Sequence, residues 1–178
     1  MAGATAAAGP AGYTAAHMTI TLIPSQKADI PFVLDCEAQA DAAPFIFPWS
    51  ADQHLQALQN ADCVHRIAVD AAGVRLGFSM LFGRKSEHRS LELRRIVVAD
   101  KHRGTGRRML ARLQQLAFLE LGAHRLWLDV KQQNTHARQL YRSMGFVEEG
   151  VLRECLTGPG DTRESLVLMA MLRHEYAG

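Results

Sequence analysis

Hydrophobic and polar residues follow two periods along the chain, and each period marks one kind of secondary structure. Alternation with period two indicates strands, which are expected over residues 19–23, 64–69, 74–82, 91–98, 126–130, 146–152 and 165–172. Apolar residues spaced three and four apart indicate helices, which are expected over residues 29–40, 50–60, 107–121 and 134–145. This order predicts an α/β fold in which a mixed sheet carries helices on both faces.

Residues that begin and end helices fall where the period changes. Ser50 is followed three residues later by Gln53, a capping box at the start of the second helix. Asn134 can cap the fourth helix and Gly145 can end it, while Gly122 can end the third. These signals support the helix boundaries that the periodicity predicts.

Length and composition are typical of one globular domain. The chain has 178 residues, of which 48% are hydrophobic, enough for a substantial core. Residues 1–17 are rich in Ala and Gly and are expected to be a disordered extension, followed by a single domain over residues 18–178. No apolar run approaches the ~20 residues that a membrane span needs, so no membrane partner is expected.

Cysteine and histidine spacing indicates no metal site and no disulfide framework. The three cysteines are far apart and form no C-x-x-C motif, and the eight histidines show no ligand spacing. A reducing cytoplasm is therefore the expected setting.

Positive charge is concentrated in one stretch. Residues 94–112 contain seven basic side chains and one acidic one, an excess of +6, which leaves −4 for the rest of the chain because the total is +2. Such a patch favours an anion. A nucleic acid is the general candidate, but the patch is short and no aromatics interleave with it, so a phosphate-rich cofactor explains it more simply. Some arginines, such as Arg112, also fit a solvated helix face.

The segment Arg103-Gly104-Thr105-Gly106 lies between an expected strand and an expected helix. Glycine lets main-chain N–H groups approach an anion closely, and the first N–H groups of a helix have no partner within the helix. Arg103, Arg107 and Arg108 add positive charge. The segment is a candidate phosphate-binding loop, although an ordinary strand-to-helix turn has the same pattern.

A second motif follows about thirty residues later, with Asn134, Ala137, Leu140, Tyr141, Gly145 and Phe146 at the spacing N-x-x-A-x-x-L-Y-x-x-x-G-F. Together the two segments resemble the GNAT superfamily of N-acetyltransferases, over residues 18–172. The resemblance implies a mostly antiparallel sheet, acetyl-CoA as co-substrate and no metal. It also resembles the branch of diamine and ribosomal-protein N-terminal acetyltransferases. Arg108 departs from the first motif, whose sixth position is usually small.

The same resemblance implies which residues bind the donor. The pyrophosphate of coenzyme A would lie on the loop formed by Arg103, Gly104, Thr105, Gly106, Arg107 and Arg108. The pantetheine arm would pair with the main chain of Ile96, Val97 and Val98, and Asn134 and Tyr141 would lie beside it.

Acetyl transfer to an amine needs a proton acceptor for the amine and a proton donor for the leaving thiolate. Glu92 is the candidate base, because the resemblance implies a glutamate there and the strand period places it on one face with Arg94, Ile96 and Val98. The alternative is that Glu92 only pairs with a neighbouring arginine. Tyr141 is the candidate acid, and its alternative is a core tyrosine packed against Phe146.

The acceptor is expected to bind the first third of the chain, beside Phe45, Phe47, Trp49 or His54. A polyamine would favour an acidic pocket there, and the candidates are Asp35, Glu37, Asp41 and Asp52. A protein N-terminus would favour an open groove. The sequence thus predicts a cytoplasmic enzyme acting on a small amine or a protein N-terminus, with a homodimer left open. The alternatives are a non-catalytic acyl-CoA-binding module and a nucleic-acid-binding domain.

Overall fold

The computed structural model describes residues 19–39, 47–99 and 104–178. One seven-stranded sheet has the order β1-β2-β3-β4-β5-β7-β6. Its strands are β1 Thr21–Pro24, β2 Cys63–Val69, β3 Arg75–Phe82, β4 Ser90–Val98, β5 Arg125–Lys131, β6 Val147–Thr157 and β7 Arg163–Leu172. Every neighbouring pair is antiparallel except β4 and β5. The predicted mixed, mostly antiparallel sheet is confirmed, while the predicted extension over residues 1–17 lies outside the described residues.

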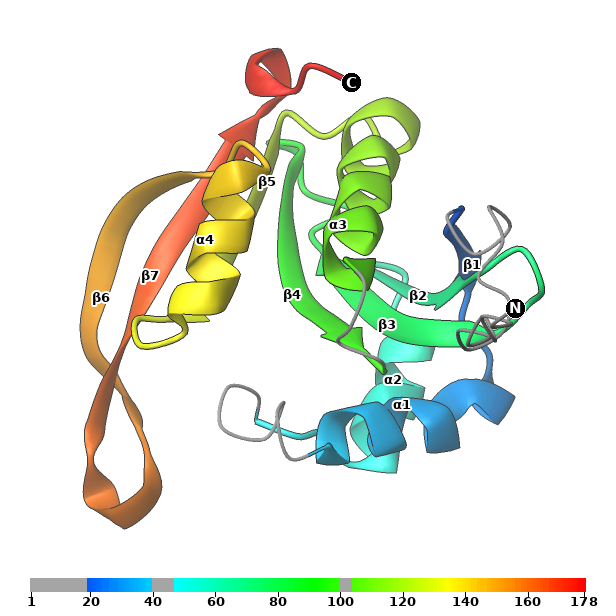
Figure 1. Cartoon of the computed structure of the whole chain (residues 1–178), viewed down its shortest axis with the longest axis horizontal. Coiled ribbons are helices and arrows are strands. Elements are labelled where there is room, and N and C mark those ends of the chain that lie inside the picture. The colour runs from blue at the N-terminus through cyan, green and yellow to red at the C-terminus, as the bar shows by residue number, and fades with distance from the viewer. Residues whose placement is uncertain (1–18, 40–46, 100–103) are drawn as a thin grey trace, which may run out of the picture.

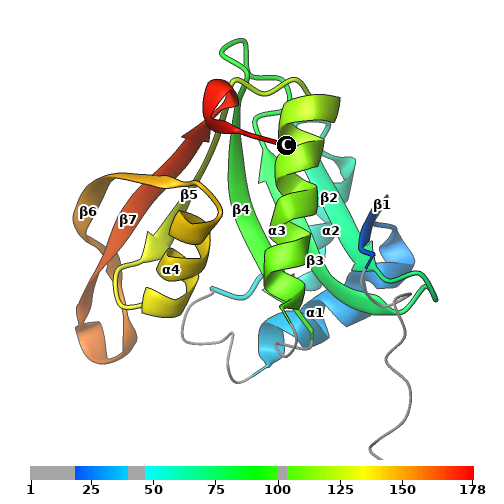
Figure 2. The same cartoon turned by 45° about the horizontal axis from the view of Figure 1, so that its top comes forward.

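Within the described residues, four α-helices cover the two faces of the sheet, as predicted. They are α1 Ile30–Ala38, α2 Ala51–Gln59, α3 Thr105–Gln115 and α4 Thr135–Ser143. Figures 1 and 2 show α3 and α4 on one face and α1 and α2 on the other. The capping box of α2 is confirmed, since Gln53 N–H donates to Ser50 Oγ at 3.3 Å and Ser50 N–H donates to Gln53 Oε1 at 2.8 Å.

Each face of the sheet has its own buried core. On the α3/α4 face, Leu110 and Leu113 of α3 pack with Leu126 of β5. On the α1/α2 face, Val33 of α1 packs with Phe78 of β3. All five side chains are fully buried, which fits the hydrophobic spacing in the sequence.

A β-bulge interrupts β4 at Arg94. Met80 of β3 pairs with Arg95, and the next residue of β3 pairs with Leu93, so Arg94 is an additional residue in β4. The bulge reverses the alternation. Leu93 lies in the α3/α4 core, whereas Val97 lies in the α1/α2 core.

The predicted sharing of one face by Glu92, Arg94, Ile96 and Val98 is therefore wrong. Ile96 and Val98 pack beside Met109 of α3, whereas Glu92 lies before the bulge on the α1/α2 face. A single added residue shifts a two-residue period by one position, and nothing in the local sequence marks it.

Two elements depart from regular geometry near their ends, and of these only β6 extends past its predicted end. The helix of α3 continues as a π-helical turn, Leu116–Glu120, before Gly122 turns the chain with a φ of 67°. The β6–β7 hairpin continues beyond residue 152, where the register shifts and Glu154 has a φ of 52°. This irregular pairing hides the strand from a search for regular alternation.

Candidate active site

Strands β4 and β5 separate along most of their length. They pair only over Ser90–Glu92 and Arg125–Trp127, yet β4 runs on to Val98 and β5 to Lys131. Figures 1 and 2 show the two strands diverging. Beyond Glu92, the main chain of β4 therefore lacks strand pairing on its β5 side. The predicted pantetheine-binding stretch Ile96–Val98 lies in this part of β4, which fits a ligand that supplies the missing hydrogen bonds.

The first turn of α3 lies at the wide end of this split. Gly104 precedes the helix with a φ of 73°, a left-handed conformation that favours glycine. A Cβ on Gly106 would lie 3.7 Å from Val98 of β4 and 3.8 Å from Leu140 of α4. The first N–H groups of α3, beginning with Thr105, are therefore placed beside the end of β4, as a bound pyrophosphate requires.

The arginines of this turn have different surroundings. Arg107 is exposed, and its guanidinium donates to Ser143 Oγ of α4 at 2.7 Å, so it bridges the two helices. Arg108 is half-buried and donates to Thr105 Oγ1 at 3.4 Å, within its own helical turn. Arg103 lies outside the described residues. Phosphate contacts by these residues remain predictions.

Helix α4 carries the candidate acid in a buried position. Asn134 caps the helix by accepting the Ala137 N–H at 3.1 Å, as predicted. Tyr141 is 9% exposed, with its ring centroid 5.8 Å from that of Phe146. Burial, reinforced by the negative charge of Asp129, raises the pKa of Tyr141 to about 12. The phenol is thus both packed in the core and kept protonated at neutral pH.

Glu92 lies at the narrow end of the split and is ion-paired. Arg94 donates from Nε to Glu92 Oε1 at 2.9 Å and from its terminal nitrogen to Oε2, and its guanidinium stacks 3.8 Å from the Phe82 ring centroid. Beside this pair is a cavity of about 280 Å³. Its lining residues are Asp62, Phe82, Gly83, Ser86, Ser90, Glu92, Arg94 and Trp127. The alternative that Glu92 pairs with an arginine is observed, so accepting a proton would require Glu92 to release one of these bonds.

Asp129 of β5 is a second carboxylate that the sequence analysis missed. Glu92 pairs with Trp127, and Asp129 follows two residues later on the same face, where β4 and β5 have separated. Within the described part of the chain, Asp129 makes no hydrogen bond or ion pair. Asp129 is exposed to solvent, but neighbouring protein atoms partly desolvate it; this desolvation, and then the charge of Glu92, raise the pKa of Asp129, while Arg94 opposes the shift.

The signal for Asp129 was present in the strand pattern. The buried positions of β5 alternate as Leu126, Leu128 and Val130. The intervening Trp127 and Asp129 must therefore face the other side. What the sequence lacks is the information that this side faces Glu92.

Of the four carboxylates predicted for an acidic pocket in the first third of the chain, Glu37 is buried and two are exposed. Glu37 is 2% exposed and paired with Arg95, so its carboxylate is not available to an acceptor. Asp35 and Asp52 are exposed on α1 and α2, and Asp41 lies outside the described residues. Glu92 and Asp129, on the neighbouring strands β4 and β5, are a second pair of carboxylates, close enough for the charge of Glu92 to act on Asp129.

The aromatic residues proposed for the acceptor site separate into buried and exposed ones. His54 is fully buried, so it cannot contact an acceptor directly. Trp49 packs against Phe82, with ring centroids 6.4 Å apart, and Phe47 is 52% exposed. Phe45 lies outside the described residues.

His65 makes the stability of this region dependent on pH. It contacts His54 at 3.4 Å and Ser25 at 2.7 Å. Burial, and then the charge of His54, lower the pKa of His65 to about 4; Arg66 acts in the same direction, while Glu37 and Asp29 oppose it. An unfolded histidine has a pKa near ~6.5. The unfolded state therefore binds more protons between these values, and stability falls as the pH drops through this window.

We therefore expect the Tm to be highest above about pH 6.5 and to decline toward the folded pKa of about 4. Because carboxylates also titrate in acid, the decisive comparison is with His65→Gln, which keeps a hydrogen-bonding side chain but removes the titration. Thermal unfolding across this window should show a shallower decline for the variant. Equal slopes would exclude His65 as a source of the acid sensitivity.

The fold and the split between β4 and β5 define a class of protein: an α/β enzyme that binds an extended, phosphate-bearing donor between diverging strands. Comparison with known proteins identifies this class. Residues 34–146 match the acetyltransferase (GNAT) family. The spermidine N(1)-acetyltransferase of Vibrio cholerae is 30% identical over 144 residues, which cover 76% of this chain and 83% of that protein.

Solved structures of a spermidine N-acetyltransferase have a similar fold. The Vibrio cholerae spermidine N-acetyltransferase in complex with CoA and spermine has a TM-score of 0.78 at 26% identity, over 89% of this chain and 98% of that one. A dodecameric structure of the same enzyme has a TM-score of 0.74 at 25% identity, over 89% and 96%.

The chain therefore belongs to the GNAT acetyltransferase family. It is an acetyl-CoA-dependent N-acetyltransferase that transfers the acetyl group to an amine. This confirms the fold, the co-substrate and the enzyme class that the two sequence motifs predict. In the described residues, no group of three or more His, Cys, Asp and Glu side chains is arranged to hold a metal ion. Nor is any described helix long and apolar enough to cross a membrane.

Proposed function

We propose that this enzyme acetylates a primary amine of a small aliphatic oligoamine, with the acceptor entering from the cavity beside Glu92. The observation that carries this proposal is the end of β4–β5 pairing at Glu92 and Trp127. A donor lying in the split from the α3 end would bring its reactive group to this point, where the cavity begins. The predicted donor contacts with Ile96–Val98 and the first turn of α3 fit this direction.

The charges around the cavity favour a cationic acceptor. Asp62 and Glu92 line the cavity together with one cation, Arg94, and Asp129 lies on the same face of the sheet. Two of these carboxylates have protein partners, whereas Asp129 has none among the described residues. An ammonium group that moves from the cavity toward the open part of the split would therefore approach Asp129 as an available anion. The activity in the names of the relatives supports the same acceptor class.

Three side chains divide the proton transfers in this proposal. Glu92 and Asp129 attract the ammonium, and a carboxylate of this pair takes its proton before the amine attacks. Tyr141, protonated at neutral pH, supplies a proton to the departing thiolate and regains one from the attacking nitrogen, which loses its second proton as the amide forms. Asp129 is the better placed acceptor of the two carboxylates, because Arg94 occupies both oxygens of Glu92.

An acetyl-transfer screen tests the acceptor class. Release of free thiol from acetyl-CoA would be measured with putrescine, spermidine, spermine, single amino acids and short peptides with a free N-terminus. Oligoamines should give the highest kcat/KM, and product analysis should place the acetyl group on a primary amine. Higher kcat/KM with the peptides would contradict the proposal and favour the protein N-terminus as acceptor.

A Gly106→Glu substitution tests donor placement. The position tolerates a Cβ, because the two neighbouring side-chain atoms would be at ordinary contact distances, so the free protein should stay folded. The new carboxylate would occupy the site proposed for the pyrophosphate. We expect acetyl-CoA to raise the Tm of the parent but not of the variant. Gly106→Ala is the matched control, and equal stabilisation of the Gly106→Glu variant would place the donor elsewhere.

We also propose that the enzyme assembles with further copies of itself and works in the cytoplasm. Strand β6 is an edge of the sheet, and it exposes Val147, Val151 and Leu152. Uncovered apolar edge strands favour association. The free cysteines support a reducing compartment. Light scattering coupled to gel filtration gives the number of copies, and a monomer at working concentration would contradict the assembly.

A further inference from the structure

The short segment of residues 47–50 lies across the split between β4 and β5. On one side, the Phe47 carbonyl accepts a hydrogen bond from Arg95 of β4 at 2.6 Å. On the other, Nζ of Lys131 on β5 lies 5.0 Å from the Phe47 ring centroid. Trp49 of the same segment packs against Phe82, which lines the cavity beside Glu92. Displacement of this segment would therefore remove the packing that supports Phe82, a wall of the cavity.

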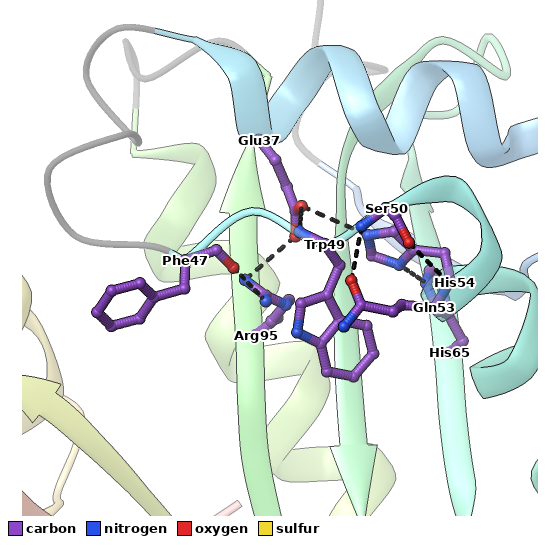
Figure 3. Close-up of polar contacts among 8 residues, drawn as sticks. All are labelled: Glu37, Phe47, Trp49, Ser50, Gln53, His54, His65 and Arg95. Atoms are coloured by element: carbon purple, nitrogen blue, oxygen red, sulfur yellow. Dashed lines mark hydrogen bonds and ion pairs between the residues drawn. The ribbon is translucent and has the colours of Figure 1, made fainter. Parts of the chain in front are cut away.

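One buried ion pair holds this segment in place (Figure 3). Arg95 approaches Glu37 Oε1 at 3.1 Å, and the two side chains are 8% and 1% exposed. The other oxygen of Glu37 accepts the Trp49 N–H at 2.8 Å. The guanidinium also stacks 4.9 Å from the Trp49 ring centroid. The ion pair thus binds a main-chain acceptor of the segment through Arg95 and a main-chain donor through Glu37.

The β4 bulge makes this ion pair possible. If β4 had no bulge, regular alternation would place Arg95 on the α3/α4 face with Leu93. With it, Arg95 points into the α1/α2 face, where Glu37 lies. The same bulge directs Arg94 toward Phe82 and Glu92. The bulge therefore places Arg95 against residues 47–50 and the consecutive Arg94 against Glu92.

The free-energy cost of burying Glu37 and Arg95 indicates that this ion pair positions the segment rather than stabilises the fold. Burying both charges carries a large desolvation penalty, and well-packed neutral replacements of such pairs are often as stable as the original. His54 adds a contact to Glu37 at 3.4 Å, and it is itself buried against His65. The network therefore fixes one arrangement of α1, α2, the segment and β4 relative to one another.

We propose that Glu37 and Arg95 are positioning residues for the acceptor, which act by holding residues 47–50 against Phe82, a wall of the acceptor site. This inference rests on the proposed acceptor site at Glu92. The donor is assigned to the main chain of β4 and to the first turn of α3, and α3 lies on the face of the sheet opposite to the one that Trp49 packs against. Loss of the ion pair should therefore impair use of the amine and leave the binding of acetyl-CoA unchanged.

The decisive variant replaces both charges, Glu37→Met with Arg95→Met, because a single replacement leaves the other charge buried and unpaired. The double variant should fold. Its kcat/KM for the amine should fall on the order of 10²-fold, mainly through a higher KM, with an unchanged Kd for acetyl-CoA. Arg112→Met with Glu120→Met, a partly exposed pair near the end of α3, is the matched control and should have no effect. Arg95→Lys keeps the positive charge but lacks the guanidinium that contacts both Glu37 and the Phe47 carbonyl, so it should give an intermediate KM.

A spectroscopic measurement separates this inference from the choice of acceptor. The chain has two tryptophans, so a Trp127→Phe background reports on Trp49 alone. In that background, the double Met variant should expose Trp49 to acrylamide quenching, with Arg95→Lys intermediate and the control pair unchanged. This result would stand even if oligoamines proved to be the wrong acceptors, since the kinetics would then use whichever amine the screen identified. Unchanged quenching together with an unchanged KM would overturn the positioning role.

Discussion

Replacing Tyr141 by phenylalanine should lower kcat by ~10²-fold while leaving acetyl-CoA binding nearly intact. The substitution removes one oxygen and keeps the ring, so the contact with Phe146 is retained. The phenol is 9% exposed, and with a pKa of about 12 it carries its proton throughout the neutral range. In the variant, no phenol is present at this position to protonate the leaving thiolate, whereas the split and the α3 turn are untouched. Steady-state kcat and Tm should be measured on the same preparation.

A matched control for this substitution is Tyr176→Phe. Tyr176 also stacks on a phenylalanine, Phe118, with ring centroids 5.1 Å apart, but it belongs to the C-terminal segment rather than to α4. The control should keep its kcat. If Tyr141→Phe also turned over normally and lost only stability, the tyrosine would be a core residue alone, and water or the substrate would be the proton source.

Most of the fold follows from local signals in the sequence. Ser50 with Gln53 marks the start of α2, Asn134 marks the start of α4, and both caps are observed. Alternation along β5 assigns its buried face correctly. These features depend on residues within a few positions of one another, which is the range over which periodicity and capping are informative.

The site was harder to predict because it depends on departures from regular structure. The Arg94 bulge and the early end of β4–β5 pairing leave no local mark in the sequence. Glu37 was expected to attract an acceptor, but only the folded chain shows that Arg95 lies beside it. A buried partner, unlike a cap, is set by residues far apart in the sequence. The sequence motifs therefore predict where the donor binds, while the proposed acceptor side depends on contacts that only the structure shows.

Asp129→Asn should reduce kcat/KM for the amine more than Glu92→Gln does, by ~10²-fold, the low end of a general-base contribution. Asp129 has no partner among the described residues, whereas Glu92 is held by Arg94. Partial desolvation and the charge of Glu92 raise the pKa of Asp129, which strengthens it as a proton acceptor. In the parent, kcat/KM for the amine should therefore fall at acid pH as Asp129 becomes protonated. This acid limb of the pH profile should be absent in Asp129→Asn.

The alkaline limb of the profile of kcat against pH gives an independent check of the role of Asp129, because the charge of Asp129 helps to raise the pKa of Tyr141. Removing that charge should lower the Tyr141 pKa, so the phenol of Asp129→Asn would lose its proton at a lower pH than in the parent.

The same coupling between Asp129 and Tyr141 has a consequence within the reaction. When Asp129 takes the proton of the amine, its charge disappears, and Tyr141 becomes a stronger acid as the thiolate departs. Profiles of kcat against pH for the parent, Asp129→Asn and Glu92→Gln decide the assignment. A larger loss in Glu92→Gln, with both limbs unchanged in Asp129→Asn, would return the role of base to Glu92.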